Sequence, residues 1–166
     1  MSITAANLGF PRIGPRRELK TATEAYWAGK IDQAALLDTA KALRAATWDR
    51  QKAAGIQVIP SNDFSFYDQV LDTSVMIGAI PEIYRAIGAP DSLDLYFAMA
   101  RGRQTKASHD EAVESGCIHN HGAGSDVPAQ EMTKWFDTNY HYMVPEVSPD
   151  QTFALSTNKP VDNFKE

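Results

Sequence analysis

Residues 9–20 are the first stretch whose residue types could do chemistry. They read Gly-Phe-Pro-Arg-Ile-Gly-Pro-Arg-Arg-Glu-Leu-Lys and carry four fixed positive charges against one negative charge. The glycines and prolines predict a turn, and the residues that follow predict the start of a helix. A helix N-terminus carries a partial positive charge and favours acidic side chains. Cations at this position indicate either a solvated helix start or a site where an anion meets outward-pointing N–H groups.

A second candidate is the cluster of Cys117, His119 and His121. Thiolate and imidazole groups are zinc ligands, and their alternate spacing would point all three the same way in an extended segment. Closed zinc sites usually take ligand pairs from separate segments, and His109 is the only other histidine or cysteine nearby. A polar loop that contains these residues is therefore the favoured interpretation, and metal binding is the alternative.

The third candidate is the block 131–146, where Lys134 stands among aromatic residues. Lysine is seldom buried without a partner. An anionic ligand would serve as that partner, and so would Glu131 or Asp137, and the sequence does not separate these alternatives. Core packing is the preferred interpretation for most of the neighbouring aromatic side chains, which are Trp135, Phe136, Tyr140 and Tyr142.

Composition excludes several classes of protein. The chain has 166 residues, of which 43% are hydrophobic and 22% charged, as expected for one globular domain. The net charge is −5 with the basic residues grouped locally, which argues against a general nucleic-acid binder. No apolar run approaches the ~20 residues that span a bilayer, no secretory leader is visible, and the single cysteine fits a reducing compartment, so we expect a cytoplasmic protein.

The elements that would position these candidates follow an alternating order. Short β-type runs are predicted at 3–10, 56–60 and 140–144, with a further extended piece at 151–156. Helical spacing predicts helices at 16–28, 33–54, 64–80, 81–87 and 93–101, and a short amphipathic turn at 132–136. Asp32 is placed to cap the second helix, and Gly55 to end it.

This order predicts parallel strands joined by helical crossovers. We therefore expect an α/β fold, helix-rich, with about three βα units of a partial (β/α)8 TIM barrel, since a complete barrel takes ~250 residues. Residues 103–130 lack periodicity and are predicted to form a long surface loop. Residues 158–166 look like a helix that has just begun, so the chain 1–166 is expected to be part of a longer protein.

Several motifs resemble the N-terminal end of the cobalamin-independent methionine synthase family. The block 131–146 is the most specific of them, and the resemblance is weakest between 107 and 130. It covers nearly the whole chain. The remaining motifs stand at 8–14, 17–20, 26–27, 48–49, 51–52, 63–68 and 100–102.

The resemblance implies a two-barrel methyltransferase several times longer than this chain. Such an enzyme moves the methyl group of 5-methyltetrahydropteroyltriglutamate to homocysteine, makes methionine and uses no cobalamin. Its zinc ion is held in the C-terminal barrel by ligands outside these residues. The resemblance therefore assigns this chain no catalytic residue and no metal ligand, and predicts that 1–166 alone is inactive.

The resemblance also implies that the N-terminal barrel binds the folate, in particular its anionic polyglutamate tail. The positions that match the family's binding residues are Arg17, Glu18, Leu19, Lys20 and Lys134. Glu18 cannot attract carboxylates, so we expect it to pair with a neighbouring arginine or to lie beside the ligand through backbone contact. The alternative function is a stand-alone, non-catalytic module that binds folate or self-associates to cover unpaired strand edges.

Overall fold

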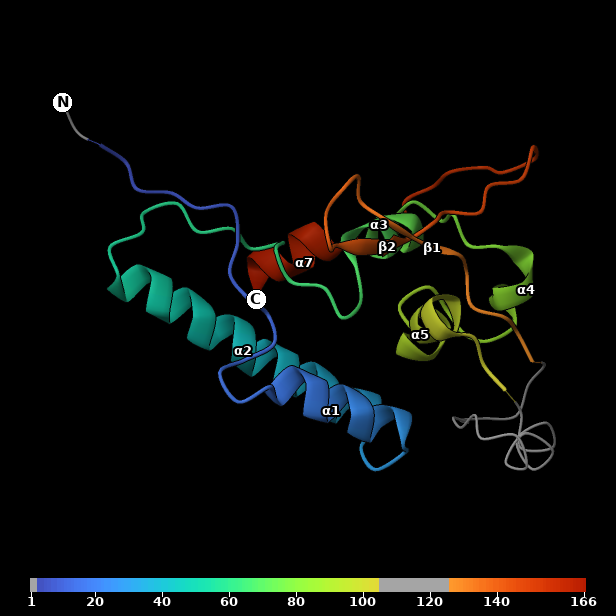
Figure 1. Cartoon of the computed structure of the whole chain (residues 1–166), viewed down its shortest axis with the longest axis horizontal. Coiled ribbons are helices and arrows are strands. Elements are labelled where there is room, and N and C mark those ends of the chain that lie inside the picture. Colours follow the sequence, from blue (N-terminus) through green and yellow to red (C-terminus); the bar gives the residue numbers. More distant parts are fainter. Residues whose placement is uncertain (1–2, 105–125) are drawn as a thin grey trace. The chain divides into compact units, whose positions relative to one another are not determined.

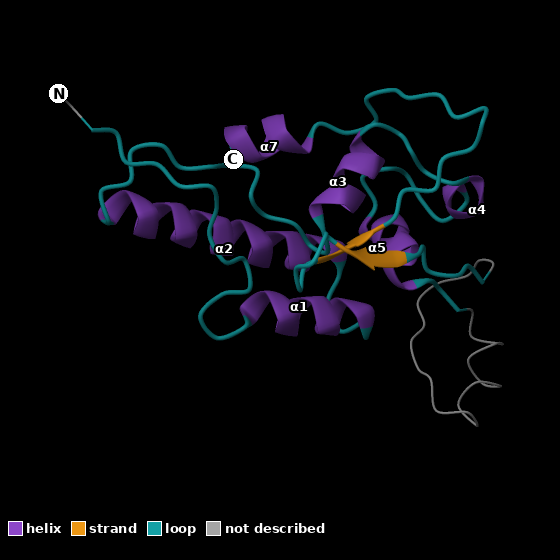
Figure 2. Cartoon of the chain, turned by 45° about the horizontal axis from the view of Figure 1, so that its top comes forward, coloured by secondary structure: helices purple, strands orange, loops and turns teal. Residues whose placement is uncertain are grey.

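The computed structural model describes residues 3–104 and 126–166, and these divide into two compact units. The first unit comprises Met1–Phe64 with Pro160–Glu166, and the second comprises Ser65–Lys159. Helices are the main element of the described residues in both views (Figure 1, Figure 2), and each unit is described by itself.

The first unit is built on two consecutive helices, α1 (Glu18–Trp27) and α2 (Gln33–Ala53), which pack against each other (Figure 1). The carboxylate of Asp32 caps α2 by accepting the N–H of Ala35 at 2.9 Å. Gly55 follows the helix with φ 85°, a left-handed conformation that glycine adopts without strain. Both predicted ends of this helix are confirmed. The buried side chains of the pair include Leu19, Leu36 and Ala40.

The segments predicted as the first two strands form one isolated parallel bridge, between Ala6 and Val58. The carbonyl of Ala5 accepts the N–H groups of Gln57 at 2.9 Å and Val58 at 3.1 Å. The two segments therefore lie side by side in the expected parallel sense, but they are too briefly paired to be strands. The helix α7 (Lys159–Lys165) ends the described chain, and all of it except Lys159 belongs to this first unit.

The second unit contains α3 (Gln69–Met76), α4 (Glu82–Arg85) and α5 (Leu93–Arg101). Helix α5 is its core element, because every residue from Leu93 to Ala100 except Asp94 is buried. The predicted helix at 64–80 was too long. Asp68 caps α3 with its side chain, and Gly78 follows it with φ 72°, so the helix occupies only the middle of that apolar run.

A small antiparallel sheet completes the second unit (Figure 2). It consists of β1 (Met132–Lys134) and β2 (His141–Met143), which pair Met132 with Met143 and Lys134 with His141. The prediction of an amphipathic turn at 132–136 was wrong, because the first three of these residues are extended. The predicted strand at 140–144 is confirmed as β2, but it runs antiparallel to β1.

One further bridge joins Arg103 to Val127, which exchange two hydrogen bonds of 2.9 Å each. The preceding Gly102 has φ 72°, and a Cβ added to it would lie 2.8 Å from the carbonyl oxygen of Val127. A side chain at 102 would therefore force these two segments apart. The predicted loop 103–130 thus has its two ends side by side, while residues 105–125 lie outside the described residues.

The architecture is helix-rich with a small two-stranded sheet, compatible with the α/β class. No helix in the described ranges 3–104 and 126–166 combines the length and apolar character needed to cross a bilayer.

Candidate functional site

The turn before α1 is fixed by contacts with the segment that carries Asp63. The N–H of Phe10 donates to Oδ2 of Asp63 at 2.8 Å, and a Cβ added to Gly9 would lie 3.3 Å from the Cβ of Asp63. The absence of a side chain at Gly9 thus lets the two segments approach. These contacts hold the start of the basic stretch on the body of the first unit.

Arg17 stands at the N-cap position of α1 with φ 64° and ψ 34°, in the left-handed region that a residue with a side chain seldom enters. Its N–H donates to the carbonyl of Gly14 at 3.1 Å, and the N–H of Leu19 donates to the carbonyl of Ile13 at 3.1 Å. These bonds close the turn onto the first residues of the helix. The side chain of Arg17, the N-cap residue, makes no capping hydrogen bond to α1.

The charges around this turn are partly paired. Glu18 forms an ion pair with Nε of Arg16 at 3.1 Å, as expected for the acid in this stretch, and Lys20 pairs with Glu24 at 3.5 Å. Arg17 is exposed and forms no ion pair with any residue in the described part of the chain. Its guanidinium is thus the cation of this turn that is available to an added anion.

The carboxylate of Glu18 is held by backbone hydrogen bonds as well as by charge. Its Oε2 accepts the N–H of Arg16 at 2.9 Å. Hydrogen bonding from its own N–H lowers the pKa of Glu18, and the bonds from Arg16 lower this pKa further. The lowered pKa favours the ionised form of this acid, whose hydrogen bonds to Arg16 lie within the turn.

Leu19 does not present its side chain to a ligand. It is 3% exposed and belongs to the core of the first unit. Its N–H is also occupied by the carbonyl of Ile13. Leu19 therefore anchors α1, and its neighbours in the sequence carry the charges. A direct contact between Leu19 and a ligand stays a prediction.

Lys134, the site residue from the later block, lies at the end of β1 in the second unit. It is exposed, so it does not have the burial that would demand a partner. It forms no ion pair with Glu131, Asp137 or any other residue at 3–104 or 126–166, which leaves an anionic ligand as the remaining alternative. Its cross-strand neighbour is His141. The other four candidate residues lie in the first unit.

Aromatic side chains follow Lys134 at the tip of the hairpin. Trp135 packs edge-on against Phe136 and Tyr142, with ring centroids 5.3 Å and 5.6 Å apart. Phe136 is 80% exposed and has φ 49°. Core packing was the wrong prediction for Phe136, Trp135 and Tyr140, which are exposed on this unit.

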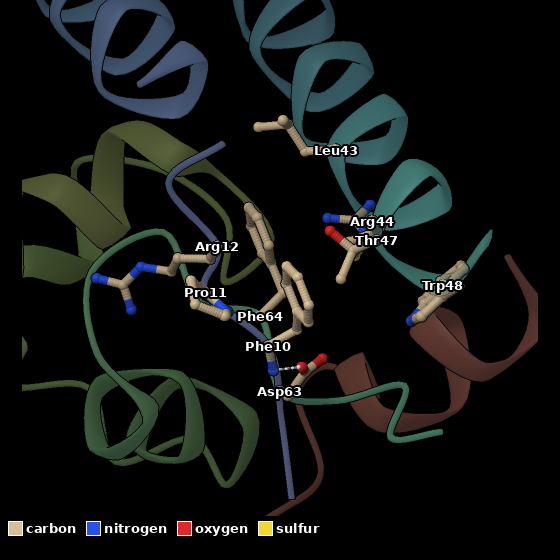
Figure 3. Close-up of a pocket in the computed structure, with 9 residues that line it drawn as sticks. All are labelled: Phe10, Pro11, Arg12, Leu43, Arg44, Thr47, Trp48, Asp63 and Phe64. Atoms are coloured by element: carbon tan, nitrogen blue, oxygen red, sulfur yellow. Dashed lines mark hydrogen bonds between the residues drawn. The ribbon is translucent and has the colours of Figure 1, made fainter. Parts of the chain in front are cut away.

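A pocket that sequence reasoning missed lies in the first unit (Figure 3). One wall comes from the turn before α1, a second from α2 and a third from the segment after it. Arg44, on α2, places its guanidinium over the ring of Phe64 at 4.9 Å and binds both carboxylate oxygens of Glu166. The lining residues are Phe10, Pro11, Arg12, Leu43, Arg44, Thr47, Trp48, Asp63 and Phe64.

No sequence signal groups these residues, because the three segments that form the pocket are separated along the chain. The pocket is mainly apolar and aromatic. The carboxylate of Asp63 accepts the N–H of Phe10, and Arg44 is paired with Glu166. The Nε1–H of Trp48 donates to the carbonyl of Pro60 at 3.2 Å. The pocket offers an aromatic surface, and Asp63 and Arg44 do not form an acid–base pair with each other.

The cluster of Cys117, His119 and His121 lies outside the described residues. Within 3–104 and 126–166, no group of three histidine, cysteine, aspartate or glutamate side chains could hold a metal ion.

Comparison with known proteins identifies relatives over the whole chain. A family model described as the cobalamin-independent synthase, N-terminal domain, matches residues 4–166. The chain is 63% identical over 166 residues to the 5-methyltetrahydropteroyltriglutamate–homocysteine methyltransferase of Caulobacter vibrioides, covering 100% of this chain and 21% of that protein.

The same enzyme of Rhodopseudomonas palustris (strain TIE-1) is 61% identical over 169 residues, with 99% of this chain and 21% of the relative covered. That of Salinibacter ruber is 53% identical over 163 residues, with 98% of this chain and 20% of the relative covered. The chain therefore spans about a fifth of the length of these relatives.

Proposed function

We propose that this chain forms part of a cytoplasmic methyltransferase. The chain belongs to the cobalamin-independent methionine synthase family, whose N-terminal domain it matches. The reaction would move the methyl group of 5-methyltetrahydropteroyltriglutamate to homocysteine, the two compounds that the relatives' names contain. In this proposal the chain binds the folate polyglutamate tail, and the remaining length of the enzyme supplies the catalytic barrel.

The exposed cations carry the proposal. Arg17 and Lys134 are both solvent-facing and free of ion pairs within the described residues, while Glu18 is held by Arg16. A triglutamate tail is a polyanion, and guanidinium and ammonium groups bind carboxylates through charge-assisted hydrogen bonds. Lys20 would also bind the tail and give up its ion pair with Glu24. That loss is small, because an exposed pair of this kind contributes only about 0.5 kcal/mol.

As the family resemblance implies, the proposal assigns this chain no step of methyl transfer, and we expect it to be inactive on its own. Among the residues at 3–104 and 126–166, no group of side chains suited to a metal ion occurs. Zinc belongs in the proposal to the part of the enzyme beyond these residues, and the reaction uses no cobalamin, in keeping with the family's description.

The partial barrel remains the proposed architecture of the complete domain. The parallel bridge between Ala6 and Val58 supports it, because the two segments are joined by α1 and α2, as in a helical crossover. In the complete domain, the segments around Ala6 and Val58 would form longer strands, because further strands of the barrel would pair beside them.

The experiment compares folate substrates with one and three glutamates in the full-length enzyme. We expect Lys134→Ala and Lys20→Ala each to raise the KM for the triglutamate about tenfold and to affect the monoglutamate much less. Arg17→Asn is the matching variant at the turn, because asparagine tolerates the left-handed backbone that Arg17 adopts.

Lys30→Ala is the control, since Lys30 is an exposed lysine of the first unit outside the proposed site. Raising the salt concentration should reduce the preference for the triglutamate in the wild type and much less in the variants, because the tail is bound by charge. Equal losses for both substrates, or losses no greater than that of Lys30→Ala, would contradict the proposed binding of the tail.

A further inference from the structure

Asp68 is a buried carboxylate that uses both of its oxygens. It is 1% exposed. Its Oδ1 accepts the N–H groups of Val70 at 2.8 Å and Leu71 at 2.9 Å, and these bonds cap α3. Its Oδ2 accepts the N–H of Met143 at 3.2 Å, a residue 75 positions further along the chain. One side chain therefore joins the start of α3 to strand β2.

A second contact joins the same two elements. The N–H of Gln69, the first residue of α3, donates to the hydroxyl oxygen of Tyr140 at 3.3 Å. Tyr140 stands immediately before β2, and Met143 ends it. Helix α3 also packs against β2, so the start of the helix holds both ends of that strand.

The strand that carries Lys134 depends on this attachment. Lys134 pairs with His141 and Met132 with Met143, so β1 is placed through β2. The side chains of β1 are exposed at all three positions, whereas Met143 is 1% exposed. The hairpin is thus fixed at Met143 and Tyr140, and its outer strand presents Lys134 to solvent.

We propose that Asp68 is a positioning residue for Lys134: through its bond to the N–H of Met143 it sets the place and direction of the hairpin that presents this lysine to an anionic folate tail. The proposal rests on the proposed function of Lys134. Burial raises the pKa of Asp68, whereas the three N–H groups favour the ionised form. An ordinary helix cap need not be buried, so the third bond, to Met143, is the feature that a capping role does not explain.

Asp68→Asn separates the two tasks of the side chain. Asparagine caps helices as well as aspartate does, so its carbonyl oxygen can retain the bonds to Val70 and Leu71. Its amide nitrogen would then face the N–H of Met143. Both groups are donors, so the hydrogen bond to Met143 would be lost. Asp32→Asn is the matched control, because Asp32 caps α2 in the first unit through Ala35, whereas the hairpin belongs to the second unit.

The test measures KM and kcat of the full-length enzyme with folate triglutamate and folate monoglutamate. We expect Asp68→Asn to raise the KM for the triglutamate about five- to tenfold, to change the monoglutamate far less, and to leave kcat for the triglutamate nearly unchanged. Tyr140→Phe, which removes the second contact, should produce the same selective effect at about twofold, and Asp32→Asn should not.

The decisive variant is the double substitution with Lys134→Ala. If Asp68 acts through Lys134, adding Asp68→Asn to Lys134→Ala should cause little further loss of triglutamate preference. Independent losses that multiply would overturn the positioning role, as would equal losses for both substrates. If Lys134→Ala alone leaves the preference intact, the proposed function fails instead. Should Asp68→Asn not fold, Tyr140→Phe with and without Lys134→Ala decides the same question.

Discussion

A Cβ added to Gly14 would lie 2.2 Å from Oε2 of Glu18, the oxygen that accepts the N–H of Arg16. The missing side chain at Gly14 is therefore what allows the acid to fold back over the turn. The same added carbon would lie 2.9 Å from Cδ2 of Leu43 on α2. Gly14 thus sets how closely the turn, the start of α1 and α2 approach one another.

We expect Gly14→Ala to lower the free energy of unfolding by about 2 kcal/mol, because φ is 84° and the side-chain ends of Glu18 and Leu43 must move aside for the new methyl group. Gly55→Ala is the control, since Gly55 has φ 85° with nothing within 4 Å of an added Cβ. It should cost about 1 kcal/mol through backbone strain alone. Equal losses in urea unfolding would show that the contacts with Glu18 and Leu43 do not matter.

A pH titration followed by carbon-detected NMR should show Glu18 with a pKa below the ordinary glutamate value. Its own N–H is the largest cause, so Arg16→Ala, which keeps the backbone donor of residue 16, should leave most of this lowering in place. Because the folded pKa is depressed, the stabilisation is present at neutral pH and is lost as the pH falls through the folded pKa. A return to the ordinary value in Arg16→Ala would show that the side chain of Arg16 dominates.

The ion pair of Arg44 and Glu166 should contribute measurably to the free energy of unfolding of the first unit. Two bonds of 2.5 Å and 2.6 Å join side chains that are 12% and 15% exposed. In a double-mutant cycle with Arg44→Met and Glu166→Gln, we expect a coupling of about 1 kcal/mol, at the upper end for pairs near the surface. Additive effects of the two substitutions would contradict it.

The same pair should make the first unit sensitive to acid. Hydrogen bonding to Arg44 lowers the pKa of Glu166, so its stabilisation is complete above the ordinary glutamate pKa of about 4.3 and is lost as the pH falls through the lower folded value. Glu166→Gln should therefore reduce the loss of stability on acidification, measured as the free energy of unfolding from pH 6 to 2.

Tyr84 supplies a test at the opposite end of the pH scale. It is fully buried, its hydroxyl donates to the carbonyl of Pro128 at 2.8 Å, and burial raises its pKa to about 12. Tyr84→Phe should cost about 1–2 kcal/mol in free energy of unfolding, since the carbonyl loses its donor. Tyr142→Phe is the comparison, because its hydroxyl has no partner within the described ranges.

The wild type should also lose stability as the pH rises from about 10 through 12, because an unfolded tyrosine ionises at about 10 while Tyr84 stays protonated. Thermal melts at pH 9 and 11 should show this loss in the wild type and a smaller one in Tyr84→Phe. The same loss in both proteins would assign the alkaline sensitivity to another group.

Local chemistry allowed much of the helical structure to be predicted. Asp32 and Gly55 mark the ends of α2 because a cap and a left-handed residue act on their nearest neighbours. The excess length predicted for α3 came from an apolar run that continues on both sides of the helix. Asp68 and Gly78, one at each end, were the available signals for its true length.

The hairpin and the pocket were not predicted from the sequence, because both are formed by contacts between residues far apart in the chain. Met132, Trp135 and Phe136 have helical spacing, but the turn-forming Asp137, Thr138 and Asn139 between them and β2 were a signal for a hairpin. The bond from Arg44 to Glu166 spans 122 positions, and that from Met143 to Asp68 spans 75. Residue types alone do not show which of many polar partners such side chains choose.

The bridge between Arg103 and Val127 has a consequence for how this domain tolerates change. The two residues are tied by their own pair of hydrogen bonds, so a change confined to the interval between them leaves the pairing residues themselves unaltered. For a flexible segment, closing a longer interval costs only about 0.6 kcal/mol for each doubling of its length. We therefore expect the bridge to tolerate a reporter peptide inserted in this interval, which urea unfolding of the resulting protein would test.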